Sequence, residues 1–395
     1  MKAFKVNNLW SGIRNIMFEL HLWIGIASSL ILFLVCLSGT VYTFKDEIQQ
    51  WLEPSRYFIS QKGERDKLPL NEMISRVESA YGGKVSSVTV PHNPDRTYTF
   101  NVRKEGESPR GTNLQINPYS GEISAEGKAK GDDFFMFMFR LHRWLLLDTN
   151  IGRPIVGWAT VAFIVLIISG WVIWIPSRIR MWKEGLKVRF SGNWLRLNLD
   201  LHRTLGFYVS VLLLVMSLTG LYWSFEWYRD GMFRVFGVER PAGGQGQGGG
   251  AQGSLSENKE GDEKPVIPVL DYEIYIAEAG RYLTYRGDYR LTMPGERDKT
   301  IALTKTKSGF FASPSGDRII LDKENAGMNK IELFSDNPLN VRIMRSVKAI
   351  HTGTIFGTFS KILYFLACLI ATSLPVTGLI IWINRLRIKA RTARG

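Results

Sequence analysis

The chain has 395 residues, a formal net charge of +14 and 45% hydrophobic residues. Many of its apolar residues lie in four uncharged stretches, each long enough to cross a bilayer core of about 30 Å, which takes about 20 helical residues. This distribution excludes a soluble protein. It gives no support to nucleic-acid binding, because Lys and Arg gather beside the apolar stretches and are best explained as a topology signal.

Four membrane-spanning helices are predicted, and the charges at their ends indicate the orientation. Lys and Arg gather in the N-terminal flank, in segment 178–201 and in the tail 385–395. These segments share one side of a four-pass topology, so we expect both termini in the cytoplasm. Segments 46–140 and 229–345 then lie on the outer face. The predicted spans are Leu22–Phe44, Pro154–Ser177, Thr204–Phe225 and Ile362–Asn384.

The two cysteines both lie within predicted spans. Cys36 belongs to segment 1–45, whose apolar run is too long for a typical signal peptide, and Cys368 belongs to the last span. A disulfide framework is therefore excluded, and we expect both cysteines to serve packing.

The outer segment 46–140 has the pattern of a small α+β domain. Residues 69–83 have the apolar spacing of a helix, and residues 84–91 and 96–104 alternate as strands do. Residues 113–123 predict a strand, a turn and a second strand.

The outer segment 229–345 repeats this order loosely. A Gly/Gln-rich stretch, residues 241–264, has too little apolar content to pack, and we expect a flexible linker there. The predicted fold class is therefore a membrane four-helix bundle, built as a parallel internal repeat, with two extracytoplasmic α+β domains.

The membrane segments repeat as well. Segments 1–45 and 202–228 match each other, as do segments 141–177 and 346–384, which end in SGWVIWI and TGLIIWI. In the first pair of segments a histidine is followed by glycine at +4 and by a Ser-Gly or Thr-Gly pair at +17 and +18. Both halves cross the membrane in the same direction, which favours packing about an axis along the membrane normal.

Four of the five histidines lie near the N-terminal ends of the four predicted helices. Alternating helix direction places His21 and His202 at the cytoplasmic face, and His142 and His351 at the outer face. Two imidazoles from two helices at equal depth are what a bis-histidine haem requires, and bundle interiors hold such sites. We therefore expect two haems of the b type. The fifth histidine, His92, is expected to be solvated in a turn.

The position of the outer pair is left open by the sequence. His142 and His351 lie about 10 to 12 residues before their predicted spans. The outer cofactor therefore lies either above the hydrocarbon or in a segment that folds back against the bundle.

Glycines are expected to let a flat macrocycle approach the helix backbones. Gly39 lies five helical turns after His21, on the same face, and Gly220 stands in the same relation to His202. Both glycines are therefore expected near the outer pair. Gly170 and Gly378 are expected near the inner pair.

Simpler explanations exist for each of these residues taken alone. One histidine at a helix end is more often an interfacial hydrogen-bonding group, and small residues are ordinary in membrane helix packing. Four histidines paired by side within a repeat favour a cofactor. Arg143, Arg203 and Arg153 flank the pairs, and they are equally suited to bind haem propionates or to anchor helices at the membrane boundary. A bare metal ion fits less well, because neither pair brings a carboxylate or thiolate.

The motifs HLWIG…LSG, LHRWLLL…GRPIVG…SGWVIWIP, DLHRTLGFY…LTG and HTGTIFG…TGLIIWINR, with INPYSGEI between spans, resemble those of PepSY-associated transmembrane proteins. The resemblance covers nearly the whole chain. It implies a bacterial inner-membrane protein of iron acquisition, with periplasmic PepSY-like domains, in a family that includes haem-containing ferric-siderophore reductases. It also implies that the haem ligands are His21, His142, His202 and His351. The Gly/Gln-rich stretch departs from the family pattern and leaves the shape of the outer surface open.

The leading functional hypothesis is a transmembrane electron conduit. A cytoplasmic donor, reduced flavin or a flavoprotein, would supply electrons, and a ferric siderophore would accept them outside. The chain has no G-x-G-x-x-G beside a strand, so we expect no nucleotide site of its own. The alternative is a non-enzymatic protein that binds or regulates a periplasmic peptide or protease. A metal-ion or siderophore permease is disfavoured. Such a protein is expected to have charged residues or broken helices at the membrane midplane, and the predicted spans have no such pathway.

Overall fold

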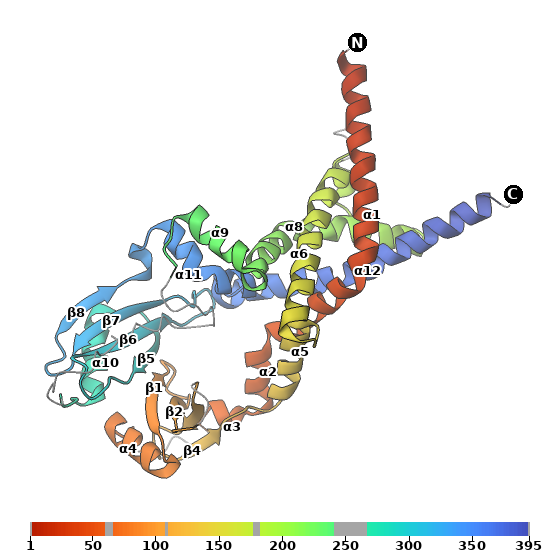
Figure 1. Ribbon diagram of the computed structural model, residues 1–395. Coiled ribbons are helices and arrows are strands. Elements are labelled where there is room, and N and C mark those ends of the chain that lie inside the picture. The colour runs from red at the N-terminus through yellow and green to blue at the C-terminus, as the bar shows by residue number, and fades with distance from the viewer. Residues whose placement is uncertain (1, 60–65, 107–109, 177–181, 241–266, 394–395) are drawn as a thin grey trace.

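A computed structural model describes residues 2–59, 66–106, 110–176, 182–240 and 267–393 (Figure 1). The Gly/Gln-rich stretch 241–264 lies outside these residues, so the predicted linker stays a prediction.

Four long helices form a bundle, and all four are long and apolar enough to cross a membrane. They contain the four predicted spans except for one or two described residues at the ends. Helix α1 packs against α6 and α12, and α8 packs against the same two helices. Helices α1 and α8 are therefore diagonal to each other, as are α6 and α12. The bounds are α1 Lys2–Thr43, α6 Thr149–Trp174, α8 Trp194–Ser224 and α12 Gly357–Thr392.

The middle of the bundle is an apolar core. Its buried residues come from α6, α8 and α12, with Cys36 of α1 packed against them. Cys368 on α12 lies 3.7 Å from the sulfur of Met216 on α8, which agrees with a packing role for this cysteine. The buried residues of this core are Ile167, Val209, Leu213, Ala367 and Ala371.

Eight antiparallel strands form one sheet in the order β4-β3-β2-β1-β5-β6-β7-β8. Each half of the chain supplies four strands, joined as consecutive antiparallel neighbours. The central pair is β1 with β5, in the register Ser87↔Thr292 and Val88↔Leu291. The strands are β1 Lys84–Val90, β2 Tyr98–Arg103, β3 Thr112–Ile116, β4 Ile123–Glu126, β5 Gly287–Thr292, β6 Thr300–Lys307, β7 Gly316–Asp322 and β8 Met328–Glu332.

The prediction of two separate α+β domains is wrong, because the two halves share this one sheet. A four-stranded sheet alone would leave β1 or β5 as an edge with unpaired backbone groups, and their pairing removes both edges. Helices α4 (Leu70–Tyr81) and α10 (Tyr272–Tyr282) pack against the same hydrophobic core.

Burial alternates along the strands, which explains how short segments build this core. In β6 and β7 every second residue is buried, as expected when one sheet face is covered and the other is not. Helix α4 buries Leu70, Met73 and Val77, the spacing of one helix face, and ends at Gly82 with φ of 72°. The helix and strands predicted within the first outer segment are confirmed.

Short helices connect the sheet to the bundle. An ion pair of 2.7 Å joins Lys45 of α2 to Asp132 of α5, and another of 2.7 Å joins Lys361 of α12 to Glu47 of α2. The connecting helices are therefore tied to one another and to the bundle. They are α2 Lys45–Leu52, α3 Pro54–Tyr57, α5 Asp132–Trp144, α9 Glu226–Phe236, the 3₁₀ turn η2 Phe334–Asp336 and α11 Leu339–Thr352; α7 Trp182–Gly185 lies between α6 and α8.

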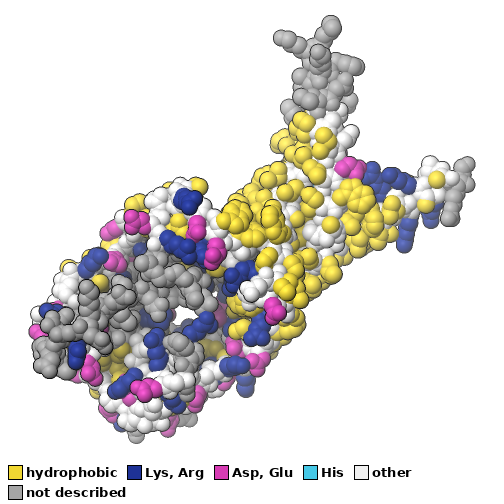
Figure 2. All heavy atoms as spheres, in the orientation of Figure 1, with side chains coloured by type: hydrophobic (Ala, Val, Ile, Leu, Met, Phe, Trp, Pro, Cys, Tyr) yellow, Lys and Arg dark blue, Asp and Glu magenta, His cyan; other side chains and the backbone are white. Residues whose placement is uncertain are grey.

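The sheet lies at one end of the bundle, and the chain termini project from the other (Figure 1). We call these ends the lobe side and the tail side. Hydrophobic side chains cover the bundle between the charged lobe and the Lys and Arg side chains near the end of α12 (Figure 2). This apolar band is the surface that a membrane protein presents to lipid.

Candidate cofactor sites: two histidine pairs

The four predicted histidines form two pairs, one at each end of the bundle. On the tail side, His21 of α1 and His202 of α8 have ring centroids 6.4 Å apart and ring planes at 86°. On the lobe side, His142 and His351 have ring centroids 6.3 Å apart and ring planes at 55°. The pairing predicted from helix direction is therefore the pairing that the structure has.

The lobe-side histidines do not lie on the spanning helices themselves. His142 belongs to α5 and His351 to α11, each of which precedes a span and is separated from it by a turn. This agrees with the sequence, in which these two histidines lie well before their predicted spans. Their segments fold back against α1 and α8, which decides between the two alternatives left open above.

Tight backbone geometry turns α5 back onto the bundle. Leu145 and Leu146 follow α5 with φ of 54° and 61°, a region that residues with a side chain rarely adopt. A Cβ placed on Gly152 of α6 would overlap the carbonyl oxygen of Trp144 at the end of α5. Glycine at this position thus permits the close contact that places His142.

Each histidine ring lies against a glycine of a neighbouring helix. A Cβ on Gly39 would lie 3.0 Å from Cε1 of His142, and one on Gly220 would lie 3.1 Å from Cε1 of His351. On the tail side the corresponding distances are 3.5 Å from Gly170 to His21 and 3.3 Å from Gly378 to His202. The four glycines singled out in the sequence therefore lie beside the pairs expected for them, where they contact the imidazole edges.

The lobe-side histidines are held in one tautomer. Nδ1 of His142 donates to the backbone oxygen of Val35 at 2.9 Å, and Nδ1 of His351 donates to the backbone oxygen of Met216 at 3.0 Å. A carbonyl oxygen only accepts, so both Nδ1 atoms carry the proton. Each Nε2 is then left with the lone pair that binds a metal.

The tail-side histidines reach the same tautomer through hydroxyl groups. Nδ1 of His21 lies 3.0 Å from Oγ of Ser169, whose proton is donated to the backbone oxygen of Leu166. Nδ1 of His202 lies 2.9 Å from Oγ1 of Thr377, whose proton is donated to backbone oxygens one turn earlier. Both hydroxyl oxygens therefore accept from Nδ1–H, and Nε2 is again available.

The spacing of each pair fits one metal ion held between two imidazoles. With metal–nitrogen bonds of about 2 Å on opposite sides of an ion, the ring centroids lie about 6 Å apart. Among the described residues, no three His, Cys, Asp or Glu side chains group together to hold a metal. Two nitrogens leave most of a coordination sphere to another ligand, which a planar tetrapyrrole supplies. The residues present thus fit a haem at each pair.

Burial favours the neutral form of both lobe-side imidazoles. Burial lowers the pKa of His351 to about 4, and His142 and Arg143 act in the same direction. Burial also lowers the pKa of His142. Neutral imidazole is the form that ligates a metal.

Two cations lie beside the lobe-side pair without a carboxylate partner among the described residues. Burial, and then the nearby Arg153, lower the pKa of Arg143. The guanidinium of Arg143 lies over the rings of Phe139 and Trp144, at 5.4 and 5.3 Å. Nε of Arg153 and Nε1 of Trp144 are buried without a hydrogen-bond partner in the described structure. Like charges and unpaired donors in a buried place favour an anionic ligand.

Arg203, the other predicted anion-binding residue, lies at the tail side and is partly engaged. It donates to the backbone oxygen of Glu184 at 3.3 Å and lies 3.9 Å from the buried carboxylate of Asp200. Its Nε is buried without a partner among the described residues. One donor of Arg203 thus remains available to a ligand.

Sequence reasoning missed the groups that accept from Nδ1. The signal was present, because Ser169 and Thr377 directly precede Gly170 and Gly378 in the repeated SG and TG pairs. Thr219 precedes Gly220 in the same way, and its hydroxyl lies 3.2 Å from Nδ1 of His351. The sequence alone assigned no role to the small polar residue before each glycine.

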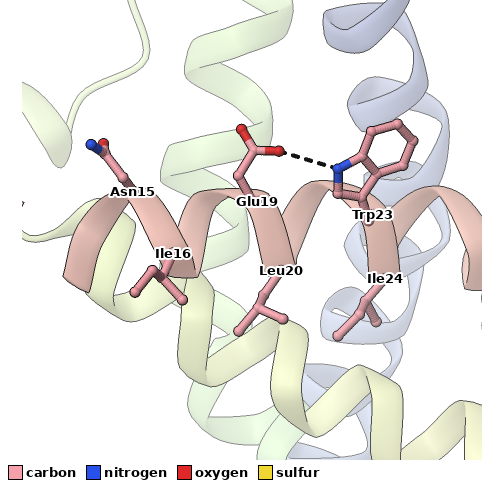
Figure 3. Close-up of a pocket in the computed structure, with 6 residues that line it drawn as sticks. All are labelled: Asn15, Ile16, Glu19, Leu20, Trp23 and Ile24. Atoms are coloured by element: carbon pink, nitrogen blue, oxygen red, sulfur yellow. Dashed lines mark hydrogen bonds between the residues drawn. The ribbon is translucent and has the colours of Figure 1, made fainter. Parts of the chain in front are cut away.

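The outer surface of α1 also has a shallow depression of about 410 Å³ (Figure 3). It lies along α1 near His21 but contains no histidine. Glu19 accepts a hydrogen bond from Trp23 there at 3.1 Å. All of its lining residues belong to successive turns of α1, and no second element contributes a side chain. We therefore assign no site to this depression. The lining residues are Asn15, Ile16, Glu19, Leu20, Trp23 and Ile24.

Comparison with known proteins assigns a family to most of the chain. The family described as the PepSY-associated TM region matches residues 18–385. The match includes all four paired histidines and all eight strands. The chain matches no curated protein significantly.

Proposed function

The chain belongs to the PepSY-associated transmembrane family, and we propose that it is a di-haem electron-transfer protein that reduces ferric siderophores. In this proposal electrons come from a reduced flavin or flavoprotein in the cytoplasm, and the acceptor is a ferric siderophore in the periplasm. The protein lies in the bacterial inner membrane with both termini in the cytoplasm, so the lobe side is periplasmic. The observation that carries the proposal is the presence of two matched histidine pairs, one at each end of the bundle.

The positions of the two pairs suit transfer across a membrane. His21 and Gly39, which lie at the tail-side and lobe-side pairs, are 18 residues apart on α1, or about 27 Å of helix. His202 and Gly220 on α8 have the same separation. This length is close to the hydrocarbon thickness of about 30 Å.

Bound haem would supply a reversible one-electron centre at each pair. The four imidazoles would ligate through Nε2, each held in place by its Nδ1–H bond. Arg143 and Arg153 would balance anionic groups at the lobe-side pair. No residue of the chain has to change its bonding during transfer, which suits a group that only passes an electron.

The core between the pairs favours an electron over an ion as the transported species. Its side chains are apolar, and the four predicted spans around it carry no Asp, Glu, Lys or Arg. An ion crossing this region would lose its hydration without gaining a partner, which costs several kcal/mol or more. This favours the conduit over a permease.

The substrate class follows from the chemistry of iron release. Oxygen-rich chelators hold Fe(III) far better than Fe(II), because they are hard ligands and lose electrostatic attraction when the charge falls. One electron delivered to the complex therefore frees the iron. Fe(III) is reduced to Fe(II), and the electron comes from the lobe-side centre.

The first test is the colour and haem content of the purified protein. We expect about two b-type haems per chain. His21→Ala and His202→Ala should each remove one and the same haem, and His142→Ala and His351→Ala the other. His92→Ala is the matched control and should keep both. A folded, colourless preparation from haem-replete cells would instead favour the peptide-binding alternative.

The second test is reoxidation of the dithionite-reduced protein. A ferric siderophore should reoxidise the haems, whereas its gallium complex should not, because Ga(III) matches Fe(III) in charge and size but accepts no electron. His351→Ala should abolish this reoxidation and leave the tail-side haem reducible. An equal rate with the iron-free chelator would defeat the proposed substrate.

A further inference from the structure

A pocket of about 300 Å³ lies in the lobe, where the two halves of the sheet meet α2. Gln50 of α2 and Phe58 form one side. The loop between β1 and β2 forms another, and the first residues of β5 and the end of β6 complete it. The lining residues are Gln50, Phe58, His92, Asn93, Arg96, Asp288, Lys307 and Ser308.

The charge of this pocket is positive. Arg96 and Lys307 have no ion-pair partner in the described part of the chain; their cationic groups lie over the rings of Phe58 and Tyr285, at 5.2 and 5.1 Å. Asp288 is already engaged, because one of its oxygens accepts from the backbone N–H of His92 at 2.8 Å and from Ser308 at 3.3 Å. Arg96 and Lys307 thus outnumber the one carboxylate in the lining, and the pocket keeps a positive balance.

The pocket is close to the lobe-side histidine pair along the chain. Gln50 lies on α2, which begins two residues after α1 ends. It follows Gly39, the glycine against His142, by 11 residues, or at most about 16 Å of helix. Helix α2 lies between the sheet and the bundle, so the α2 wall of the pocket is the one nearer the bundle (Figure 1).

We propose that this pocket binds an anionic arm of the ferric chelate, so that the preferred substrates are negatively charged complexes of the carboxylate or catecholate type. This proposal rests on the reductase function proposed above and adds the charge class of its substrate. Arg96 and Lys307 pair with the chelate, and Gln50 and Asn93 supply neutral hydrogen-bond donors. The volume is at the lower end of ligand pockets, which suits one arm of a larger complex.

Binding of gallium complexes to the oxidised, full-length protein tests the pocket without electron transfer. The probes are the gallium complex of an anionic tris-catecholate chelator and that of a cationic trihydroxamate. Arg96→Gln/Lys307→Gln should weaken binding of the anionic complex about tenfold or more at low ionic strength and leave the cationic one unchanged. The matched control is Lys84→Gln/Arg281→Gln, which removes two exposed positive charges elsewhere on the lobe.

Equal weakening by the control pair would overturn the proposal, because it would show that only the net charge of the lobe matters. Displacement of the anionic complex by a short acidic peptide at lower concentration would also overturn it, in favour of a peptide as the occupant. Failure of the reductase hypothesis looks different. In that case no ferric complex of either charge reoxidises the reduced protein, whether or not the gallium complexes bind.

Discussion

At the residue scale, the most informative groups are the oxygens that accept from the four Nδ1–H groups. Two are backbone carbonyls, of Val35 and Met216, and two are hydroxyls, of Ser169 and Thr377. A mutation cannot remove the carbonyls but can remove the hydroxyls. The Thr219 hydroxyl also lies 3.2 Å from Nδ1 of His351, but the Met216 carbonyl stays as an acceptor when that hydroxyl is removed. Substitution should therefore alter the hydrogen bonding of the tail-side pair most.

Ser169→Ala and Thr377→Ala should each raise the midpoint potential of the tail-side haem. Loss of the acceptor makes imidazole a weaker donor, which destabilises Fe(III) more than Fe(II). We expect a shift of tens of mV, since a tenfold change in relative affinity is about 59 mV for one electron. Spectroelectrochemical titration measures both haems. Ser373→Ala, which removes a hydroxyl from α12 away from His202, should shift neither.

Substitution of Gly39 and Gly170 by alanine should affect the lobe-side haem and spare the tail-side haem. A Cβ at Gly39 would be 3.0 Å from His142, closer than ordinary contact, whereas one at Gly170 would be 3.5 Å from His21, an ordinary distance. Gly39→Ala should therefore perturb the optical and electron paramagnetic resonance spectra of the lobe-side haem. Gly170→Ala should leave the tail-side spectra unchanged, and equal effects at both glycines would contradict this geometry.

The histidines and glycines could be predicted at this scale because the internal repeat preserves their offsets. The acceptors of Nδ1–H could not, since serine and threonine in membrane helices commonly bond to their own backbone. Ser169 and Thr377 do this as well as accepting from histidine. Only the three-dimensional arrangement reveals the second bond.

At the scale of elements, the fold-back of α5 and α11 decides where the lobe-side pair lies. Each is anchored at the lobe and ends in a turn against the bundle. The turn after α11 has a sequence signal, because Gly353 ends that helix with φ of 73°. The turn after α5 has none. Leu145 and Leu146 adopt positive φ although neither is glycine, so no typical turn residue marks the end of α5 in the sequence.

Gly152→Ala should remove the lobe-side haem and keep the tail-side haem. The added Cβ overlaps the carbonyl oxygen of Trp144, so α5 must move away from α6. Overpacking of this kind costs about 1–3 kcal/mol or more, which is enough to displace a ligand. Haem content and spectra measure the loss. Gly12→Ala, at a position with open space around it, should keep both haems, and loss of both haems in Gly152→Ala would point to general misfolding instead.

At the scale of the whole molecule, the single sheet joins the two halves outside the membrane as the bundle joins them within it. Strand content and helix order could be predicted from alternation and apolar spacing. The pairing of β1 with β5 could not, because alternation shows which face of a strand is buried and not which strand lies beside it. The prediction of two separate domains was wrong for this reason.

A double cysteine variant, Ser87→Cys/Thr292→Cys, should form a disulfide. The two residues are directly opposed in the β1–β5 pair, at a separation that a disulfide can bridge in an antiparallel sheet. Mass spectrometry of the linked peptides under non-reducing conditions measures it. Ser87→Cys/Lys330→Cys, with the second cysteine on β8 at the far edge of the sheet, should stay unlinked. Two independent domains would leave both variants unlinked.

The central strand pair also sets the order of events during synthesis. Arg290 on β5 donates to Ser87 on β1 across 203 residues, and two membrane helices lie between them in the chain. While those residues are being made and inserted, β1 has β2 on one side and an unsatisfied edge on the other. Such an edge pairs readily with other chains, and contacts this distant in sequence form slowly. We therefore expect the protein to depend most on a chaperone while only the first half of the chain has been synthesised.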